Sequence, residues 1–254
     1  MNYAGFSSAV RTLVFWVLLV LLDSVMGGQV TSLFSKVGGS FVEKECLLST
    51  VVPATTGMDL RRACSSICML TASCSFFCSL TSTGTCALFK AFVAVRWQGH
   101  QVSTTGTKYD ACYTSWGDPR DIVKTNSPFT YSTALTIYYP QFATDGYACV
   151  APAYFVTGLY TNSFSQIDLQ QTTRVQKVIA ATAWPRHIID MDVILSNTSD
   201  FNLGQKIGRV VGDTPAWSTY TIVTNSSVAG RYITFYQIAM NHHGYADIQI
   251  IPQP

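Results

Sequence analysis

The chain has 254 residues, of which only 12% are charged, and its 16 Lys and Arg against 14 Asp and Glu give a formal net charge of +2. This balance excludes the broad basic surface that nucleic acids and acidic membranes attract, so we expect no nucleic-acid partner. Eight cysteines indicate an oxidising compartment, where they can form four disulfides.

The first 28 residues have the pattern of a cleaved secretory signal. Arg11 precedes the apolar run 12–22, which is about half as long as the roughly 20 residues that cross a bilayer. Small residues then follow as far as Gly28. We therefore expect cleavage after Gly27 or Gly28, a secreted extracellular product and no membrane span after cleavage. The alternative is a signal anchor that stays on the chain.

The cysteines divide the remaining chain into two parts. Six of them lie between Cys46 and Cys86, followed by Cys112 and Cys149, and none follows Cys149. Eight half-cystines allow about 105 pairings, so the count alone leaves the connectivity open. The front part is expected to be small and cross-linked, whereas the back part needs a hydrophobic core of its own.

The front part has the pattern of one helix and a pair of strands. Residues 58–70 repeat apolar positions at helical spacing, and Asp59 is placed to cap the helix. Cys64 and Cys68 lie one turn apart on one face, so each should bond to a neighbouring element. Strands are expected at 74–78 and 86–89 around a turn. A helix cross-linked to a small antiparallel sheet follows.

The back part has the pattern of many short strands. Residues 117–130 are polar and contain prolines, which predicts a linker. Beyond them, short alternating or β-rich segments are separated by turn residues, at 166–169, 190–195, 220–224, 231–238 and 247–250. Strands at this spacing, without an amphipathic helix, predict an antiparallel sandwich or barrel.

The front part resembles a PAN/apple module over residues 42–116. The resemblance rests on the spacing Cys64-x3-Cys68-x5-Cys74, followed by Phe76-Phe77 and Cys86-Ala87-Leu88. It implies a helix on a curled sheet that binds proteins or sugars. It also implies three disulfides, with two cysteines left over to join the domains: the pairs are Cys64–Cys86, Cys68–Cys74 and Cys46–Cys112, and the remaining pair is Cys78–Cys149.

The back part, residues 131–254, resembles a discoidin-type (coagulation-factor type C) galactose-binding-like domain of the fucolectin branch. The resemblance rests on short pieces in the right order, among them 143–146, 165–169, 175–178 and 246–250. It implies an antiparallel jelly-roll β-sandwich with ligand-binding loops at one end. The expected fold is therefore mainly β, with a small disulfide-rich α+β module in front of the sandwich.

The same resemblance implies a structural calcium ion. Asp145, in the Asp-Gly turn, and Asp247, in the last strand, fall on the positions of acidic calcium ligands in fucolectins. Calcium prefers six to eight oxygen ligands, so these carboxylates would need backbone carbonyls beside them. The alternative is that Asp145 caps a turn and Asp247 is a solvated strand residue.

The sugar site implied by the resemblance is altered here. Fucolectins hold fucose with a histidine and an Arg-x-Asp loop, but the corresponding residues 180–187 lack the first arginine and the aspartate. Trp184 offers a face for a sugar ring, Arg186 and His187 offer donors, and Phe155 in the loop 153–160 is expected to form the other lip of a cleft. The alternative is that Trp184 and Phe155 pack the sandwich.

The sequence has no catalytic motif that we can identify. Serine-hydrolase elbows, His-Glu-x-x-His and paired Cys-x-x-Cys patterns do not occur. Adjacent side chains on a strand point to opposite faces, so His242 and His243 form a poor chelate and are expected on a surface loop. Two sequons predict glycosylation at Asn197 and Asn225.

These features predict a secreted, lectin-like or adhesive recognition protein with a glycan or glycoprotein ligand, acting in innate defence or in the extracellular matrix. The front module is expected to add a second contact or to hold a homo-oligomer. The alternative function is a matrix or cell-surface protein that binds proteins and no sugar. We do not expect an enzyme, since a secreted enzyme would need a polar cluster that the sequence does not reveal.

Overall fold

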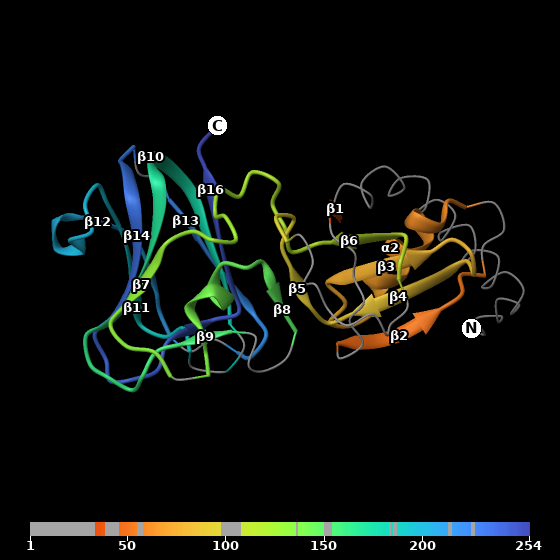
Figure 1. Cartoon of the computed structure of the whole chain (residues 1–254), viewed down its shortest axis with the longest axis horizontal. Helices are drawn as coiled ribbons and strands as arrows, with labels where there is room; N and C mark the ends of the chain where they lie inside the picture. The colour runs from red at the N-terminus through yellow and green to blue at the C-terminus, as the bar shows by residue number, and fades with distance from the viewer. Residues whose placement is uncertain are drawn as a thin grey trace, which may run out of the picture.

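The computed structural model of the chain describes residues 34–38, 46–54, 58–97, 108–135, 137–149, 154–182, 184, 187–212, 215–224 and 227–254. They form a disulfide-rich unit and a larger β-sandwich that lie side by side (Figure 1). The predicted signal lies outside the described residues. Within the described ranges, no helix has the length and apolar character needed to cross a membrane.

The first unit is a five-stranded antiparallel sheet with a helix packed against it. The strand order is β1-β6-β3-β4-β2, with bounds Ser35–Val37 (β1), Leu47–Val51 (β2), Phe76–Leu80 (β3), Thr85–Phe89 (β4) and Ala111–Thr114 (β6). Helix α2, Leu60–Leu70, begins after Asp59, whose carboxylate accepts a hydrogen bond from the Arg61 amide at 3.3 Å. The predicted helix and the strand pair β3–β4 are confirmed, and the PAN/apple resemblance itself stays a prediction.

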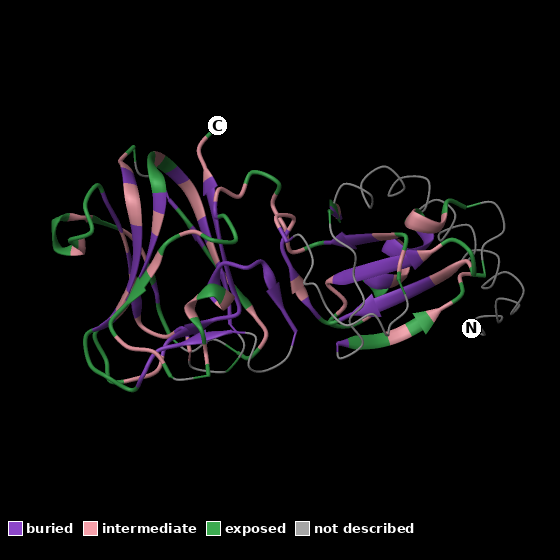
Figure 2. Cartoon of the chain, viewed as in Figure 1, coloured by how far each residue is buried: buried purple, intermediate pink, exposed green. Residues whose placement is uncertain are grey.

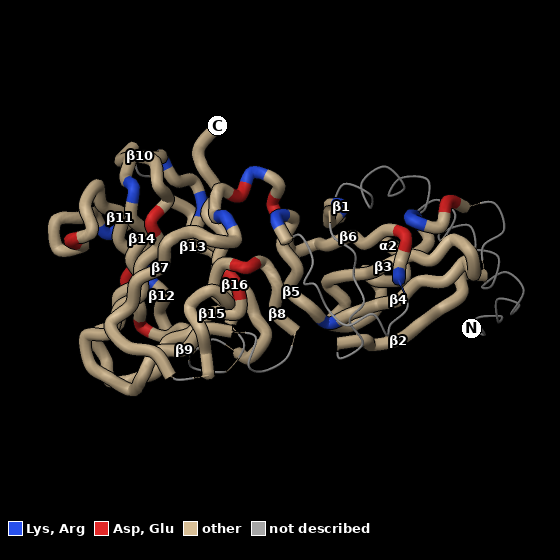
Figure 3. The backbone as a smooth tube through the Cα atoms, viewed as in Figure 1, with Lys and Arg blue, Asp and Glu red and all other residues tan. Residues whose placement is uncertain are grey.

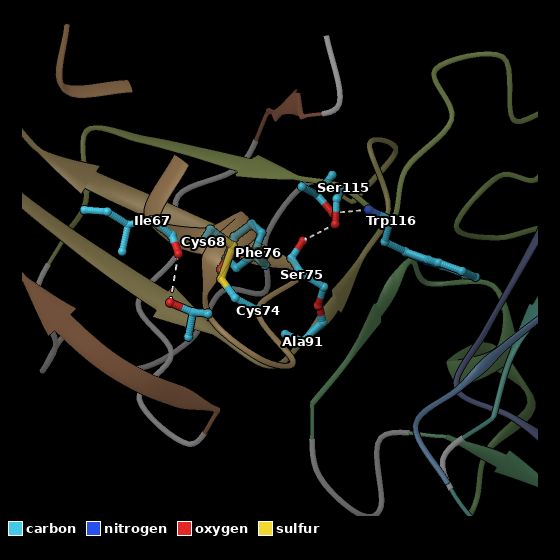
Figure 4. The surroundings of a disulfide bond; sticks show 10 residues. Ile67, Cys68, Cys74, Ser75, Phe76, Ala91, Ser115 and Trp116 are labelled. Atoms are coloured by element: carbon cyan, nitrogen blue, oxygen red, sulfur yellow. Dashed lines mark hydrogen bonds between the residues drawn. A yellow bond between two sulfur atoms is a disulfide. The ribbon is translucent and has the colours of Figure 1, made fainter. Parts of the chain in front are cut away.

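Four disulfides cross-link the chain. Two agree with the expected pairing: Cys64–Cys86 ties α2 to β4, and Cys68–Cys74, shown in Figure 4, ties α2 to the segment before β3. The expected pairs Cys46–Cys112 and Cys78–Cys149 are wrong. Cys78 and Cys112 face each other in the register of β3 and β6, with Cα atoms 4.0 Å apart, and so bond within the sheet. Cys46 bonds to Cys149 and joins the two units.

The second unit is an antiparallel β-sandwich organised around one long strand. Strand β10, Ser163–Ala181, pairs through its first half with β14 and β7 and through its second half with β13 and β16. Strands β11 and β12 extend the first layer beyond β14. The bounds are Phe129–Tyr131 (β7), Met191–Ser196 (β11), Gln205–Val210 (β12), Thr219–Val223 (β13), Ala229–Gln237 (β14) and Asp247–Pro252 (β16).

Strand β10 changes layer at an irregularity. Its register with β14 shifts between Asp168 and Thr173, and Gln170 lies in the left-handed region with φ 61°. Apolar side chains from both layers fill the space between them, including Ile167, Val178, Val193, Ile233 and Ile250. Figure 2 shows this burial along the strands of both units. The mainly β fold with an antiparallel sandwich is confirmed.

Short elements complete the sandwich and its junction with the first unit. Strand β5, Phe92–Val93, pairs with β8, Tyr147–Ala148, across the junction. Strand β9, Phe155–Val156, pairs with β15, Gly244–Tyr245, and two 3-10 turns occupy Pro140–Ala143 (η2) and Phe201–Leu203 (η3).

Residues 117–130 are not a free linker. Val123 is 2% exposed within the sandwich core, and the Ile122 amide donates to the Ile250 carbonyl at 3.0 Å. The polar and proline residues that suggested a linker make the segment irregular, but its apolar side chains still pack on β16. The sandwich therefore begins before residue 131.

Candidate functional site

One end of the sandwich is built from four loops, which we call the loop end: the described residues within 132–139, 157–162, 182–190 and 238–243. Because β10 bends between its layers, both its first and its last residues lie at this end. Backbone hydrogen bonds tie the loops to one another and to the strands beside them, from Thr157 N to His243 O at 2.8 Å, from Asn162 N to Ile238 O at 3.3 Å, from Gly244 N to His187 O at 3.0 Å and from Leu135 N to Val156 O at 3.1 Å. Loops that are far apart in sequence thus form one face.

Trp184 is one of three aromatic side chains that the described loop end presents to solvent, with Tyr139 and Tyr160. It is 51% exposed, and the Thr182 hydroxyl donates to its carbonyl at 2.6 Å. Its indole N–H donates to the hydroxyl of Tyr154, which in turn is hydrogen bonded to Tyr138. The Tyr138 and Tyr154 rings lie 4.8 Å apart. The edge of the indole is therefore anchored while its ring stays accessible, so the packing alternative for Trp184 does not hold.

Two histidines lie beside this aromatic group. The His187 ring centroid is 6.2 Å from that of Tyr154 and 6.4 Å from that of His242. His242 Nδ1 is 2.8 Å from the Thr157 carbonyl, which can only accept, so Nδ1 has the proton. Nε2 of a neutral His242 is then a hydrogen-bond acceptor. Burial, with His242 nearby, lowers the pKa of His187 to about 4, so it is neutral at physiological pH.

His243 supports the loop end from within the sandwich. Its side chain is fully buried, and Nδ1 is hydrogen bonded to Ser163 Oγ at 3.1 Å. Burial lowers its pKa to about 3. The expectation of a surface loop is therefore wrong for His243, because β15 begins at the next residue and directs this side chain inward.

Phe155 does not line a ligand site. It is fully buried, lies 4.9 Å edge-on from the ring of Phe129 and stacks on Tyr245. The predicted role of Phe155 is therefore wrong, and its packing alternative holds. Arg186 lies outside the described residues. Tyr138 and His242 belong to the site but were not predicted, because no spacing in the sequence brings them to Trp184.

The described part of the loop end has little charge. Among its described residues, Asp190 is the only charged side chain. The polar groups that it offers beside Trp184 are hydroxyls, imidazoles and backbone groups. Such groups suit a ligand that has both an apolar face and hydroxyl groups.

The residues expected to hold calcium do not fit that ion. Asp247 is fully buried: one carboxylate oxygen accepts the Trp116 indole N–H at 2.8 Å, and the other accepts from the Arg96 guanidinium. Asp145 is 7% exposed and accepts the Tyr147 amide at 2.9 Å. Since a guanidinium already holds Asp247, a second cation would meet repulsion there. The turn-capping alternative holds for Asp145, but Asp247 is not solvated.

The two predicted glycosylation sites differ in what can be said of them. Asn197 is exposed in the turn after β11, which leaves room for a glycan. Asn225 lies outside the described residues. Glycosylation at both positions stays a prediction.

The chain is similar to several solved protein structures. No family model matches the chain, and no curated protein matches it. The lectin domain of lectinolysin in complex with Lewis b antigen is 16% identical, with a TM-score of 0.44, covering 54% of this chain and 99% of that one. A serum fucolectin of the striped bass Morone saxatilis is 12% identical, with a TM-score of 0.47 and 72% of each chain covered.

A family 32 carbohydrate-binding module of Clostridium perfringens NanJ, in complex with galactose, is also similar. It is 11% identical, with a TM-score of 0.44, covering 52% of this chain and 97% of that one. At this level of similarity, the ligand of the present chain has to be argued from its own residues.

Proposed function

We propose that this chain is a secreted, lectin-like recognition protein that binds a sugar of a glycan or glycoprotein at its loop end. The observation on which this rests is the exposed ring of Trp184, held at its edge by Tyr154. Secretion is supported by the signal pattern of residues 1–28 and by four disulfides.

The chemistry of the site explains the choice of ligand. A pyranose ring has an apolar face of C–H groups, which can lie on an indole, and hydroxyls at its rim that both donate and accept hydrogen bonds. His242 Nε2 offers an acceptor, and the His187 ring lies beside it. These groups fit a sugar ring that has free hydroxyls at its rim.

The test is binding of the signal-free protein to a glycan array, with three variants. Trp184→Ala removes the ring and is expected to weaken binding to the best glycan at least about tenfold, the loss of roughly 1.4 kcal/mol. Trp184→Phe keeps a stacking face and is expected to retain part of the affinity. The control Leu203→Ala removes a more accessible apolar side chain, 75% exposed against 51% for Trp184, in η3 at the opposite end of β11.

Selective binding that Trp184→Ala weakens and Leu203→Ala does not would support the proposal. A blank array from folded wild-type protein would contradict it. Binding that all variants retain would place the sugar site elsewhere and contradict the assignment of Trp184.

The second candidate is protein binding without sugar. It is favoured by exposed apolar side chains in the loops of the loop end, including Ile137 (55%), Ile238 (54%) and Met240 (64%). Exposed apolar side chains on loops at one end of a domain are available for a protein contact. A blank glycan array, combined with adhesion to matrix proteins that Met240→Ser abolishes, would favour this alternative.

A further inference from the structure

Arg96 reaches from the junction into the base of the sandwich. It follows β5, and its side chain is 10% exposed. The guanidinium contacts the carboxylates of Asp121 and Asp247. It also donates to the Ile248 carbonyl at 3.0 Å and, through Nε, to the Thr144 carbonyl at 3.1 Å. We call these four oxygen-bearing residues the Arg96 cage.

We propose that the Arg96 guanidinium is the built-in cation of this sandwich, which takes the place expected for calcium and locks the two units together without a metal. Asp247 is the acidic residue of the last strand that was expected to bind the ion, and Thr144 directly precedes the Asp-Gly turn. The guanidinium thus occupies the oxygen-lined position between the turn and the strand.

The carboxylates of the cage are held in place by hydrogen bonds from groups other than Arg96. The Trp116 indole fixes one oxygen of Asp247, and the amides of Val123 and Ile250 fix Asp121 Oδ1 at 3.0 and 2.9 Å. A planar guanidinium has five donors in a rigid fork, which suits several oxygens spread around it. Because these hydrogen bonds already fix the carboxylates, the carboxylates lose little conformational entropy when Arg96 binds them.

The same contacts couple the units. Strand β5 pairs with β8, and the Ala94 amide donates to the Gly146 carbonyl at 2.7 Å. Trp116 follows β6 of the first unit and points away from the nearby disulfide, toward the sandwich (Figure 4). Figure 3 shows basic and acidic residues together at this junction, between β5 and β16. Arg96 and Trp116 therefore both bring groups of the first unit to Asp247.

The first experiment uses the wild-type protein alone. Its melting temperature is measured in millimolar calcium chloride and in EDTA, together with calcium binding by titration calorimetry. We expect the two temperatures to agree within about 1 °C and no stoichiometric calcium binding, since Arg96 holds the ligands. Stoichiometric calcium binding that Asp247→Asn abolishes would overturn the proposal.

The second experiment compares Arg96→Met with the control Arg120→Met. Arg120 pairs with Asp118 at 2.9 Å, but its side chain is 48% exposed. Removing one partner of a buried ion pair costs far more than removing a surface one, so Arg96→Met should lower the melting temperature by at least about 6 °C and Arg120→Met by about 2 °C or less. Equal, small effects would overturn the proposal.

Hydrogen exchange tests the coupling separately from stability. In Arg96→Met we expect the Ala94 amide to exchange at least about tenfold faster, with a smaller change at Ile233 in the centre of β14. Unchanged exchange at Ala94 would contradict the lock. If Arg96→Met does not fold, Arg96→Lys tests the role of the guanidinium instead. It keeps the charge with three donors instead of five, and its melting temperature should be measurably below that of the wild type. A Lys variant as stable as wild type would overturn the role of the fork.

Discussion

His243 is held in its neutral form by burial beneath the loop end, with a pKa lowered to about 3. Above about pH 6.5 neither the folded nor the unfolded chain protonates it, so its full contribution to stability is present. As the pH falls from 6.5 toward 3, the unfolded chain binds a proton that the folded chain does not. The free energy of unfolding should therefore fall by roughly 1.4 kcal/mol for each pH unit from this residue, measured by urea unfolding at pH 7, 6 and 5.

The variant His243→Gln isolates this effect. It removes the titrating group, so its stability should depend less on pH than that of the wild type, whatever its absolute stability. His242→Gln serves as the neighbouring control and should keep most of the wild-type slope. His187, whose pKa is about 4, contributes in the same direction in both variants. Identical slopes for His243→Gln and wild type would contradict the buried, neutral assignment.

Single residues of the site were only partly predictable. Trp184 follows strand residues and precedes a proline, so its place on a loop could be inferred from the sequence. Tyr154 and Phe155 are adjacent and both buried, and nothing local shows that only Tyr154 contacts the Trp184 indole. Arg96 and Asp247 are 151 residues apart, and their contact exists only because the two units dock.

At the scale of elements, β10 shows what local patterns reveal and what they miss. The alternation at 166–169 correctly predicts a strand, and the end of the strand at Ala181 brings Trp184 to the loop end. The sequence pattern does not predict that one continuous strand belongs to both layers, because the change of layer depends on a bend at Gln170. Helix α2 was predictable because it combines a cap with helical spacing.

The turn at Gly146 positions β8 against the segment after β5. Gly146 has φ 83°, and a Cβ there would lie 3.2 Å from Ala94 Cβ and 3.3 Å from Arg96 Cγ. Gly146→Ala should therefore add steric conflict to backbone strain and lower the free energy of unfolding by about 2 kcal/mol or more. Chemical denaturation measures it.

Gly212→Ala is the matched control for this substitution. Gly212 has φ 80°, with nothing within 4 Å of an added Cβ, so only the backbone strain is introduced. The loss in Gly146→Ala should exceed the loss in Gly212→Ala. Equal losses would show that the close approach of β5 to this turn does not contribute.

At the scale of the whole molecule, the Cys46–Cys149 disulfide spans 103 residues and joins the units. Replacing both cysteines by serine frees a long loop in the unfolded chain and should lower the unfolding free energy by roughly 4–5 kcal/mol. The pair Cys68–Cys74 spans only 6 residues, so its removal should cost roughly 2 kcal/mol. Denaturant unfolding of the two double variants compares them, and a larger loss for the short loop would contradict the entropic explanation.

The overall architecture was predictable because composition, cysteine distribution and strand spacing all indicate a cross-linked unit before a sandwich. The junction was not, since spacing does not reveal which cysteine crosses it. Tyr147 and Cys149, from the second part of the chain, pack in a core cluster with Phe76 and Phe89 of the first unit. Residues on either side of the expected boundary therefore share one interior.

Because of that shared interior, the sandwich cannot be cut out as a separate fragment without losing core contacts. A fragment cut at residue 131 would lose Val123 from its own core and the partners of Tyr147, and would leave Asp247 buried without Arg96 or Trp116. The smallest transplantable piece must include the segment from β5 onward. Gene fusion or domain shuffling at the apparent boundary would therefore remove buried contacts on which both units depend.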